Sequence, residues 1–200
     1  MNNTLQELKQ KIVDLSLSAY RAGLFSGTSG NMSVRVPGGM LITPTSVRYD
    51  VMTKEQIVGM GLDGVFFSGS PENPSSEWRM HAAVYEAYPD CGAVFHTHSP
   101  YATAFAACRE SIPPVLIEAM IFLGGEVRCA AYARPGTKKV GLNAVPALEG
   151  RGGCTLANHG VLAVGRDLDE AYLRAEYIED VAKVASIART VGTPVPLEML

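Results

Sequence analysis

Two short hairpins constrain the fold of this chain more strongly than any other feature of its sequence. Residues 32–43 (MSVRVPGGMLIT) read as two strands joined by a Pro-Gly-Gly turn, and side chains alternate in polarity along the first strand. Residues 153–165 (GCTLANHGVLAVG) read as two apolar strands that reverse direction at Asn158, His159 and Gly160. A hairpin pairs its strands in opposite directions, so both segments predict a mostly antiparallel sheet.

Helical segments lie between and around the predicted strands. Apolar residues recur at helical spacing from Leu5 to Ala19, which predicts an amphipathic first helix that packs on the core. Pro, Gly and Asp signals bound further helices over residues 74–90, 99–108, 136–150 and 167–192. Additional strands are expected at residues 64–70, 92–98 and 124–132. Strands and helices do not alternate strictly, so we expect an α/β fold in which helices pack on an antiparallel sheet.

Composition indicates a globular protein and argues against some classes of partner. The 200 residues suffice for one domain over residues 1–200. The net charge is −3 and no basic stripe is visible, so nucleic acid is not an expected partner. We expect no membrane association, because no apolar run is long enough to span a bilayer and no signal or lipidation sequence is recognisable. Four scattered cysteines without a C-x-x-C pair predict a cytoplasmic protein with free thiols.

An apolar strand that ends in two histidines gives the first indication of chemistry. Residues 93–98 read AVFHTH, and in a strand His96 and His98 point to the same face. Two imidazoles on one rigid face suit a divalent metal, although exposed histidines at a strand end would show the same spacing. His159 also lies at the end of an apolar strand, and a third imidazole would complete the three-histidine set of a catalytic zinc site. The remaining histidine, His81, lies within a predicted helix and is expected to be a hydrogen-bonded core histidine or one that supports the site.

The segment PSSE, residues 74–77, suggests an anion seat. The first turn of a helix has unpaired backbone N–H groups and favours an anion, and Ser75 and Ser76 add hydroxyl donors. The loop SGTSGN, residues 26–31, offers further donors, but it lacks the lysine of a P-loop. Glu77 has two interpretations that the residues alone do not separate. It is either an acidic residue favoured by the helix dipole, or a carboxylate that ligates a metal or moves a proton.

Five segments, in their order and spacing, resemble the class II aldolase/adducin family. They are GTSGNMS (27–33), LITPTS (41–46), PSSEWRMH (74–81), HTHSPYATA (96–104) and ANHGVLAVG (157–165). The resemblance extends from the first helix to the last and is greatest to the L-fuculose-1-phosphate aldolase branch. It implies a three-layer α/β/α fold around a mostly antiparallel sheet, and a homotetramer with active sites where subunits meet. Coverage of the surface by other subunits would also agree with a charged fraction of only 18%.

The resemblance also implies an activity and a set of site residues. Zinc, one ion per subunit, would be bound by His96, His98 and His159, with Glu77 as a ligand that leaves when substrate binds and then acts as the base. The reaction would be the reversible cleavage of a phosphorylated 2-ketose into dihydroxyacetone phosphate and a small aldehyde, the reaction of a metal-dependent aldehyde-lyase. The substrate phosphate would be bound by Thr28, Gly30, Asn31, Thr45, Ser46, Ser75 and Ser76.

Two departures from the family pattern concern the aldehyde half of the substrate. Glu118, in VLIEAMIFLGG, lies nearest to the position of the tyrosine proton donor of the aldolase branch, so it is the candidate for that proton transfer. Residues 193–200 (TPVPLEML) carry no aromatic side chain, unlike the tail of that branch. The enzymatic alternatives are a 5-deoxyribulose or methylthioribulose 1-phosphate aldolase, an L-ribulose-5-phosphate 4-epimerase and a methylthioribulose-1-phosphate dehydratase. An adducin-like interaction module is the non-enzymatic alternative, but it predicts loss of the metal histidines.

Overall fold

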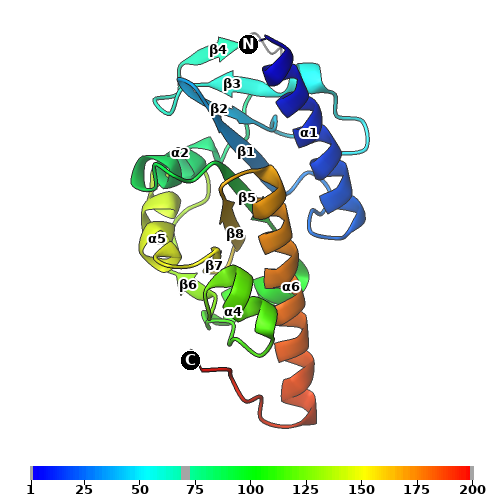
Figure 1. Ribbon diagram of the computed structural model, residues 1–200, viewed down its shortest axis with the longest axis vertical. Helices are drawn as coiled ribbons and strands as arrows, with labels where there is room; N and C mark the ends of the chain where they lie inside the picture. The colour runs from blue at the N-terminus through cyan, green and yellow to red at the C-terminus, as the bar shows by residue number, and fades with distance from the viewer. Residues whose placement is uncertain (1, 69–72, 199–200) are drawn as a thin grey trace.

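One eight-stranded sheet runs through the computed structural model, which describes residues 2–68 and 73–198 (Figure 1). The strands lie in the order β4-β3-β2-β1-β5-β8-β7-β6. Every neighbouring pair within the described residues is antiparallel except β6 and β7, which are parallel. The strands are β1 Asn31–Val36, β2 Gly39–Ile42, β3 Val58–Met60, β4 Phe66–Ser68, β5 Ala93–Thr97, β6 Arg128–Ala130, β7 Gly153–Leu156 and β8 Gly160–Gly165.

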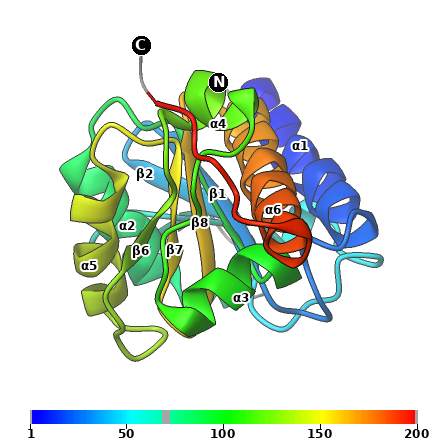
Figure 2. The same ribbon diagram turned by 90° about the horizontal axis from the view of Figure 1, so that it is seen from below.

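Helices cover both faces of this sheet, as the view from below shows (Figure 2). One face carries α2 and α5, and the other carries α1, α3, α4 and α6. The helices are α1 Asn2–Arg21, α2 Trp78–Ala87, α3 Pro100–Cys108, α4 Ile117–Leu123, α5 Lys138–Leu148 and α6 Leu168–Val191, with a short 3-10 helix at Lys54–Gln56. The predicted α/β class with a mostly antiparallel sheet is confirmed, and the parallel β6–β7 pair makes the sheet mixed.

The central strand β5 is buried on both faces. Val94 packs with the apolar side chains of α2 and α5, whereas Phe95 packs with those of α1, α3, α4 and α6. Both side chains are fully inaccessible, which explains why this strand reads as a continuous apolar run. His96 follows Val94 by two residues, so its ring lies on the face that carries α2.

Both predicted hairpins are confirmed. Ser33 pairs with Ile42 in the first, and Leu156 pairs with Gly160 in the second. The predicted strand at residues 64–70 is found only as Phe66–Ser68, and its last two residues lie outside the described part of the chain.

One helix prediction needs correction, and one helix was missed. The helix expected from residue 74 begins at Trp78, because the backbone N–H of Ser75 instead bonds to the carbonyl of Thr43. Helix α4 was not expected. Its seven residues are almost all apolar, and its N-cap Leu116 makes no side-chain cap, so neither periodicity nor a capping signal marks it.

Among the described residues, no helix combines the length and apolar character that crossing a bilayer requires.

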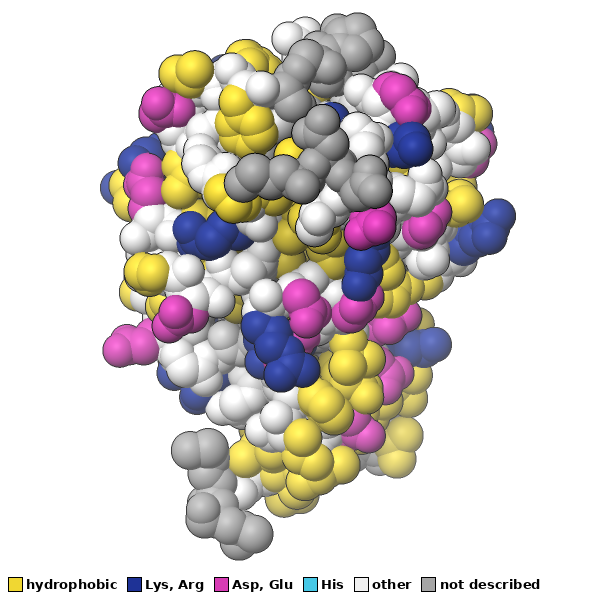
Figure 3. Space-filling model, turned by 45° about the horizontal axis from the view of Figure 1, so that its top comes forward, with side chains coloured by type: hydrophobic (Ala, Val, Ile, Leu, Met, Phe, Trp, Pro, Cys, Tyr) yellow, Lys and Arg dark blue, Asp and Glu magenta, His cyan; other side chains and the backbone are white. Residues whose placement is uncertain are grey.

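On the face drawn in Figure 3, basic side chains are scattered among acidic ones.

Candidate active site

Three histidines meet because β5 and β8 are antiparallel neighbours. Thr97, at the end of β5, pairs with Val161, near the start of β8. His96 and His98 therefore lie beside His159, which precedes β8 directly. The ring centroids of His96 lie 4.8 Å from those of His98 and of His159, and the latter two rings are 5.2 Å apart. The side chain of Glu77 completes the cluster, and one possible ligand atom from each of the four residues lies within 4.8 Å of all the others.

The tautomer of His96 is set by the backbone. Its Nδ1 lies 2.7 Å from the carbonyl oxygen of Val161 and donates to it, so in the neutral ring the lone pair lies on Nε2. That Nε2 lies 2.8 Å from Oε2 of Glu77 and 3.0 Å from Nε2 of His98. Electron-rich atoms this close are favourable only with a proton or a cation between them. Three imidazole nitrogens and a carboxylate oxygen are a donor set that suits zinc, so these residues fit a divalent metal.

Burial keeps His98 ready to ligate. Burial, together with the neighbouring His96 and His159, lowers the pKa of His98 to about 4, so its ring is neutral at physiological pH. A neutral imidazole is the form that binds a metal. The Nδ1 of His159 is buried and has no hydrogen-bond partner among the described residues, unlike the Nδ1 of His96.

Glu77 connects the histidines to the loop before α5. It is the N-cap residue of α2 and is 7% exposed. Its Oε2 faces the histidines, 3.4 Å from Nε2 of His159, and its Oε1 accepts a hydrogen bond from the N–H of Gly136 at 3.3 Å. Burial alone would raise the pKa of Glu77, but the neighbouring rings of His159 and His96 hold that pKa well below its usual range. Glu77 is therefore a carboxylate while it faces the histidines.

The seven predicted phosphate-binding residues line one pocket of 350 Å³ together with three of the four predicted metal ligands. The pocket is lined by Thr28, Gly30, Asn31, Thr45, Ser46, Ser75 and Ser76, together with Glu77, His98 and His159. Two backbone hydrogen bonds join the loops that supply them: Thr45 N–H to the Asn73 carbonyl, and Ser75 N–H to the Thr43 carbonyl, both at 3.0 Å.

The pocket differs from the sequence prediction in the position of its serines and in four additional lining residues. Ser75 and Ser76 lie in the turn before α2 rather than in its first helical turn, because Glu77 is the N-cap. Sequence reasoning also missed Ser29, Pro44, Pro135 and Gly136, which line the same pocket. The sequence predicts that Gly136 begins a helix, whereas α5 begins at Lys138, and no local signal marks Gly136 or Pro135 as part of a site.

Glu118 does not join this cluster within one chain. It lies in α4 and is absent from the residues that line the pocket. His81 is also outside the metal cluster, but it is fully buried and hydrogen-bonded at both ring nitrogens.

Comparison with known proteins decides the family. The model of the class II aldolase and adducin N-terminal domain matches residues 10–186. This chain belongs to that family. It is 36% identical to an L-fuculose phosphate aldolase of Escherichia coli over 191 residues, which cover 96% of this chain and 88% of the relative. It is 37% identical over 176 residues to a 5-methylthioribulose-1-phosphate/5-deoxyribulose-1-phosphate aldolase of Rhodospirillum rubrum, covering 88% of this chain and 79% of the relative. A solved L-fuculose 1-phosphate aldolase superposes with a TM-score of 0.91 at 36% identity, covering 96% of this chain and 91% of the other.

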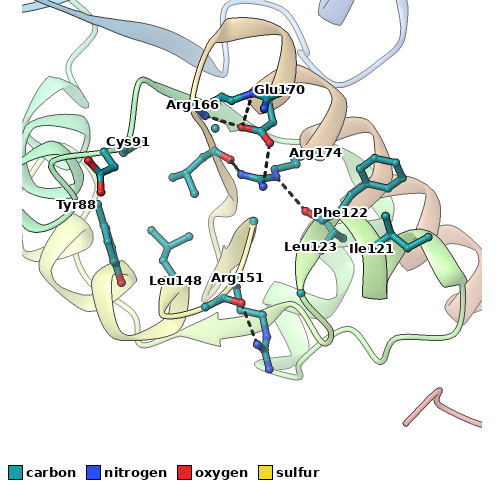
Figure 4. Close-up of a pocket in the computed structure, with 16 residues that line it drawn as sticks. Tyr88, Cys91, Ile121, Phe122, Leu123, Leu148, Arg151, Arg166, Glu170 and Arg174 are labelled. Carbon is teal, nitrogen blue, oxygen red and sulfur yellow. Dashed lines mark hydrogen bonds and ion pairs between the residues drawn. The ribbon is translucent and has the colours of Figure 1, made fainter. Parts of the chain in front are cut away.

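A second cavity, of 490 Å³, lies at the opposite end of strands β5 and β8 from the histidine cluster (Figure 4). It borders Cys91, which precedes β5, and Gly165, which ends β8. Arg174 lines it, but its guanidinium group is already bonded to the carbonyls of Phe122 and Val164 and paired with Glu170. None of the predicted site residues lines this cavity.

Proposed function

We propose that this class II aldolase chain reversibly cleaves a phosphorylated 2-ketose of the L-fuculose 1-phosphate type into dihydroxyacetone phosphate and a small aldehyde, with zinc as its cofactor. One observation carries the proposal. A cluster of three histidines and a glutamate opens into the same pocket as a set of hydroxyl, amide and glycine groups suited to an anion. Metal-dependent cleavage of a sugar phosphate would need both features in one pocket.

The histidines would hold the metal. His96, His98 and His159 offer ring nitrogens, and Glu77 offers Oε2 as a fourth ligand in the absence of substrate. A bound divalent cation would supply Lewis-acid stabilisation of the negative charge that the ketose fragment gains when its C3–C4 bond breaks. Three protein nitrogens with one exchangeable ligand is the arrangement of a catalytic rather than a structural zinc site.

Glu77 would act as the base. Its pKa is low because it faces His96 and His159. Once substrate displaces it from the histidines, those interactions are lost while its burial remains, and burial raises a carboxyl pKa. Glu77 then becomes able to accept a proton, and it moves that proton to and from the C3 carbon of the dihydroxyacetone phosphate fragment. A positioned carboxylate of this kind contributes about 10²- to 10⁴-fold to the rate.

The anion seat would bind the substrate phosphate. Hydroxyl groups of Thr28, Thr45, Ser46, Ser75 and Ser76 and the amide of Asn31 all line the pocket, as does the backbone of Gly30. The described residues that line the pocket include no lysine or arginine, so neutral hydrogen-bond donors would bind the phosphate. Such donors orient a phosphate by geometry rather than by opposite charge.

Glu118 would serve a site on another subunit. In its own chain it lies in α4 and does not line the pocket, so another subunit of the homotetramer that we propose would have to supply the site that it serves. Exposed apolar side chains of α4 support such an assembly, since Ile117 and Ile121 are 57% and 66% exposed. Hydrophobic side chains also gather toward the lower end of the face in Figure 3.

We propose further that residues 1–200 form one domain. We also propose that the protein is cytoplasmic, because all four of its cysteines are free thiols.

The test is to incubate the zinc-loaded protein with L-fuculose 1-phosphate, 5-deoxyribulose 1-phosphate, methylthioribulose 1-phosphate and L-ribulose 5-phosphate. Mass spectrometry separates cleavage from loss of water, and chromatography separates an epimer from its substrate. Formation of dihydroxyacetone phosphate supports the proposal, and the preferred substrate identifies the aldehyde. Epimerisation or dehydration alone would refute it.

A second arm of this experiment tests the base. Glu77→Gln should leave zinc content unchanged and abolish deuterium exchange into dihydroxyacetone phosphate. Retained exchange would remove Glu77 from this role.

A further inference from the structure

A buried chain of hydrogen bonds leads from helix α2 to Asn31 in the pocket. The hydroxyl of Tyr85 lies 2.8 Å from Oγ of Ser33, and that Oγ lies 2.7 Å from Nδ1 of His81. The other ring nitrogen of His81, Nε2, lies 2.6 Å from Oδ1 of Asn31. All four side chains are at most 4% exposed. We call this set, Tyr85, Ser33, His81 and Asn31, the α2 relay.

The relay follows from the periodicities of its two elements. Asn31 and Ser33 are two residues apart on β1, so both point to the face that carries α2. His81 and Tyr85 are four residues apart on α2, so they lie on one side of that helix. Asn31 is also the β1 residue that pairs with His96 in β5. The relay thus ends beside the metal cluster without containing any of its ligands.

With Oδ1 of Asn31 facing His81, only one set of hydrogen positions satisfies every member. Oδ1 of Asn31 accepts but cannot donate, so Nε2 of His81 must carry the proton. Nδ1 then accepts from the hydroxyl of Ser33, whose oxygen accepts from Tyr85. The ring has to be neutral for this, and burial together with His96 lowers the pKa of His81 to about 3. Arg35 lies 4.6 Å from the centre of the Tyr85 ring and helps to fix the far end of the relay.

We propose that His81 is a positioning residue that decides which end of the Asn31 amide faces the anion pocket. Since Oδ1 is bound to His81, the NH₂ group of Asn31 is turned toward the pocket that Asn31 lines. With the opposite tautomer the amide would turn over and present its carbonyl oxygen, which repels a phosphate. This inference rests on the proposed function, because it assumes that Asn31 donates to the substrate phosphate.

The hydrogen positions can be read directly on the wild-type protein. A long-range ¹H–¹⁵N spectrum of the zinc-loaded protein should show Nε2 of His81 protonated and Nδ1 unprotonated. A proton on Nδ1 would overturn the proposal without any variant having to fold.

Two substitutions separate the two ends of the ring. Gln places its amide near the position of Nε2 and can still donate to Asn31, whereas Asn reaches only the position of Nδ1. The probe is inorganic phosphate, measured as the Kd for the zinc-loaded protein. His81→Asn should raise this Kd about tenfold, the loss expected for one hydrogen bond to a charged group. His81→Gln should change it less than threefold, and both variants should keep one zinc per chain.

The Asn31→Ala background shows whether His81 acts through Asn31. There, His81→Asn should have no further effect on the Kd. Equal weakening by both His81 variants, or an undiminished effect of His81→Asn in Asn31→Ala, would overturn the proposal. If Asn31→Ala itself binds phosphate as tightly as the wild type, the proposed anion seat fails and this inference fails with it. If Asn31→Ala weakens binding but His81→Asn does not, only the positioning role fails.

Discussion

Replacing Gly160 with alanine should disorganise the histidine cluster without removing a ligand. Gly160 opens β8 directly after His159 and faces the end of β5. A Cβ atom built at this position lies 2.3 Å from the carbonyl oxygen of Thr97, and 3.2 Å from both Cε1 of His96 and Cδ2 of His98. The backbone oxygen cannot rotate away as a side chain could, so β5 and β8 have to separate locally.

The required movement is large compared with what a metal site tolerates. Carbon atoms approach a neighbouring atom to about 3.5 Å, so the strands would have to move apart by about 1 Å. Metal–ligand distances are held within about 0.2 Å. We therefore expect Gly160→Ala to weaken zinc binding by about 10- to 100-fold, the range seen when the support of ligands is disturbed. Overpacking should also lower the free energy of unfolding by about 1–3 kcal/mol.

The assay is competition for zinc against a chromogenic chelator, with thermal unfolding followed by circular dichroism on the same samples. Gly192→Ala is the matched control. A Cβ there meets nothing within 4 Å and its φ of 178° is extended backbone, so this variant should bind zinc like the wild type. Wild-type zinc affinity in Gly160→Ala would refute the packing of β8 against the two histidines.

Three further predictions concern other parts of the site. The pKa of His81 is about 3 in the folded protein, against an ordinary value of 6.5. Between pH 6.5 and pH 3 the unfolded chain therefore binds a proton at His81 that the folded protein does not bind. The free energy of unfolding should fall as the pH is lowered through that range. Urea titrations of the metal-free protein at several pH values give the free energy of unfolding as a function of pH. His81→Gln should make its decline shallower by up to about 1.4 kcal/mol per pH unit. The same slope in the variant and the wild type would mean that the pKa of His81 is not lowered by folding. Gly30→Ala should destabilise the protein by more than about 2 kcal/mol, because the φ of Gly30 is 94° and a Cβ would lie 2.4 Å from Cδ1 of Phe25; a wild-type melting curve would contradict the described loop. Glu118→Gln should slow carbon–carbon cleavage while deuterium exchange into dihydroxyacetone phosphate persists, and equal loss of both activities would argue against a role confined to the aldehyde.

Local sequence patterns indicated candidate site residues, but they did not indicate where those side chains meet. The two-residue period of a strand places His96 and His98 on one face, and this needs no knowledge of the fold. Their meeting with His159 depends on the pairing of β5 with β8, two strands separated by more than 60 residues of sequence. From the sequence, only the family resemblance links all three histidines with Glu77.

Features that depend on tertiary contacts were missed or shifted. Helix α2 begins at Trp78 rather than at residue 74, because the backbone N–H of Ser75 bonds to the carbonyl of Thr43 outside the helix. The contact of Gly136 with Glu77 comes from the turn before α5, where the sequence predicts the first residue of a helix and gives no sign of a site. The α2 relay was equally hidden, since the sequence indicates that His81 is buried but cannot name its partners.

Diffraction from crystals of the zinc-loaded protein, with data on both sides of the zinc absorption edge, tests the central claim most directly. We expect one anomalous peak per chain at about 2.0–2.1 Å from a ring nitrogen of each of His96, His98 and His159, at the edge of the pocket lined by Ser75 and Asn31. An ion bound elsewhere, or one that leaves any of these three imidazoles outside its coordination sphere, would contradict the account.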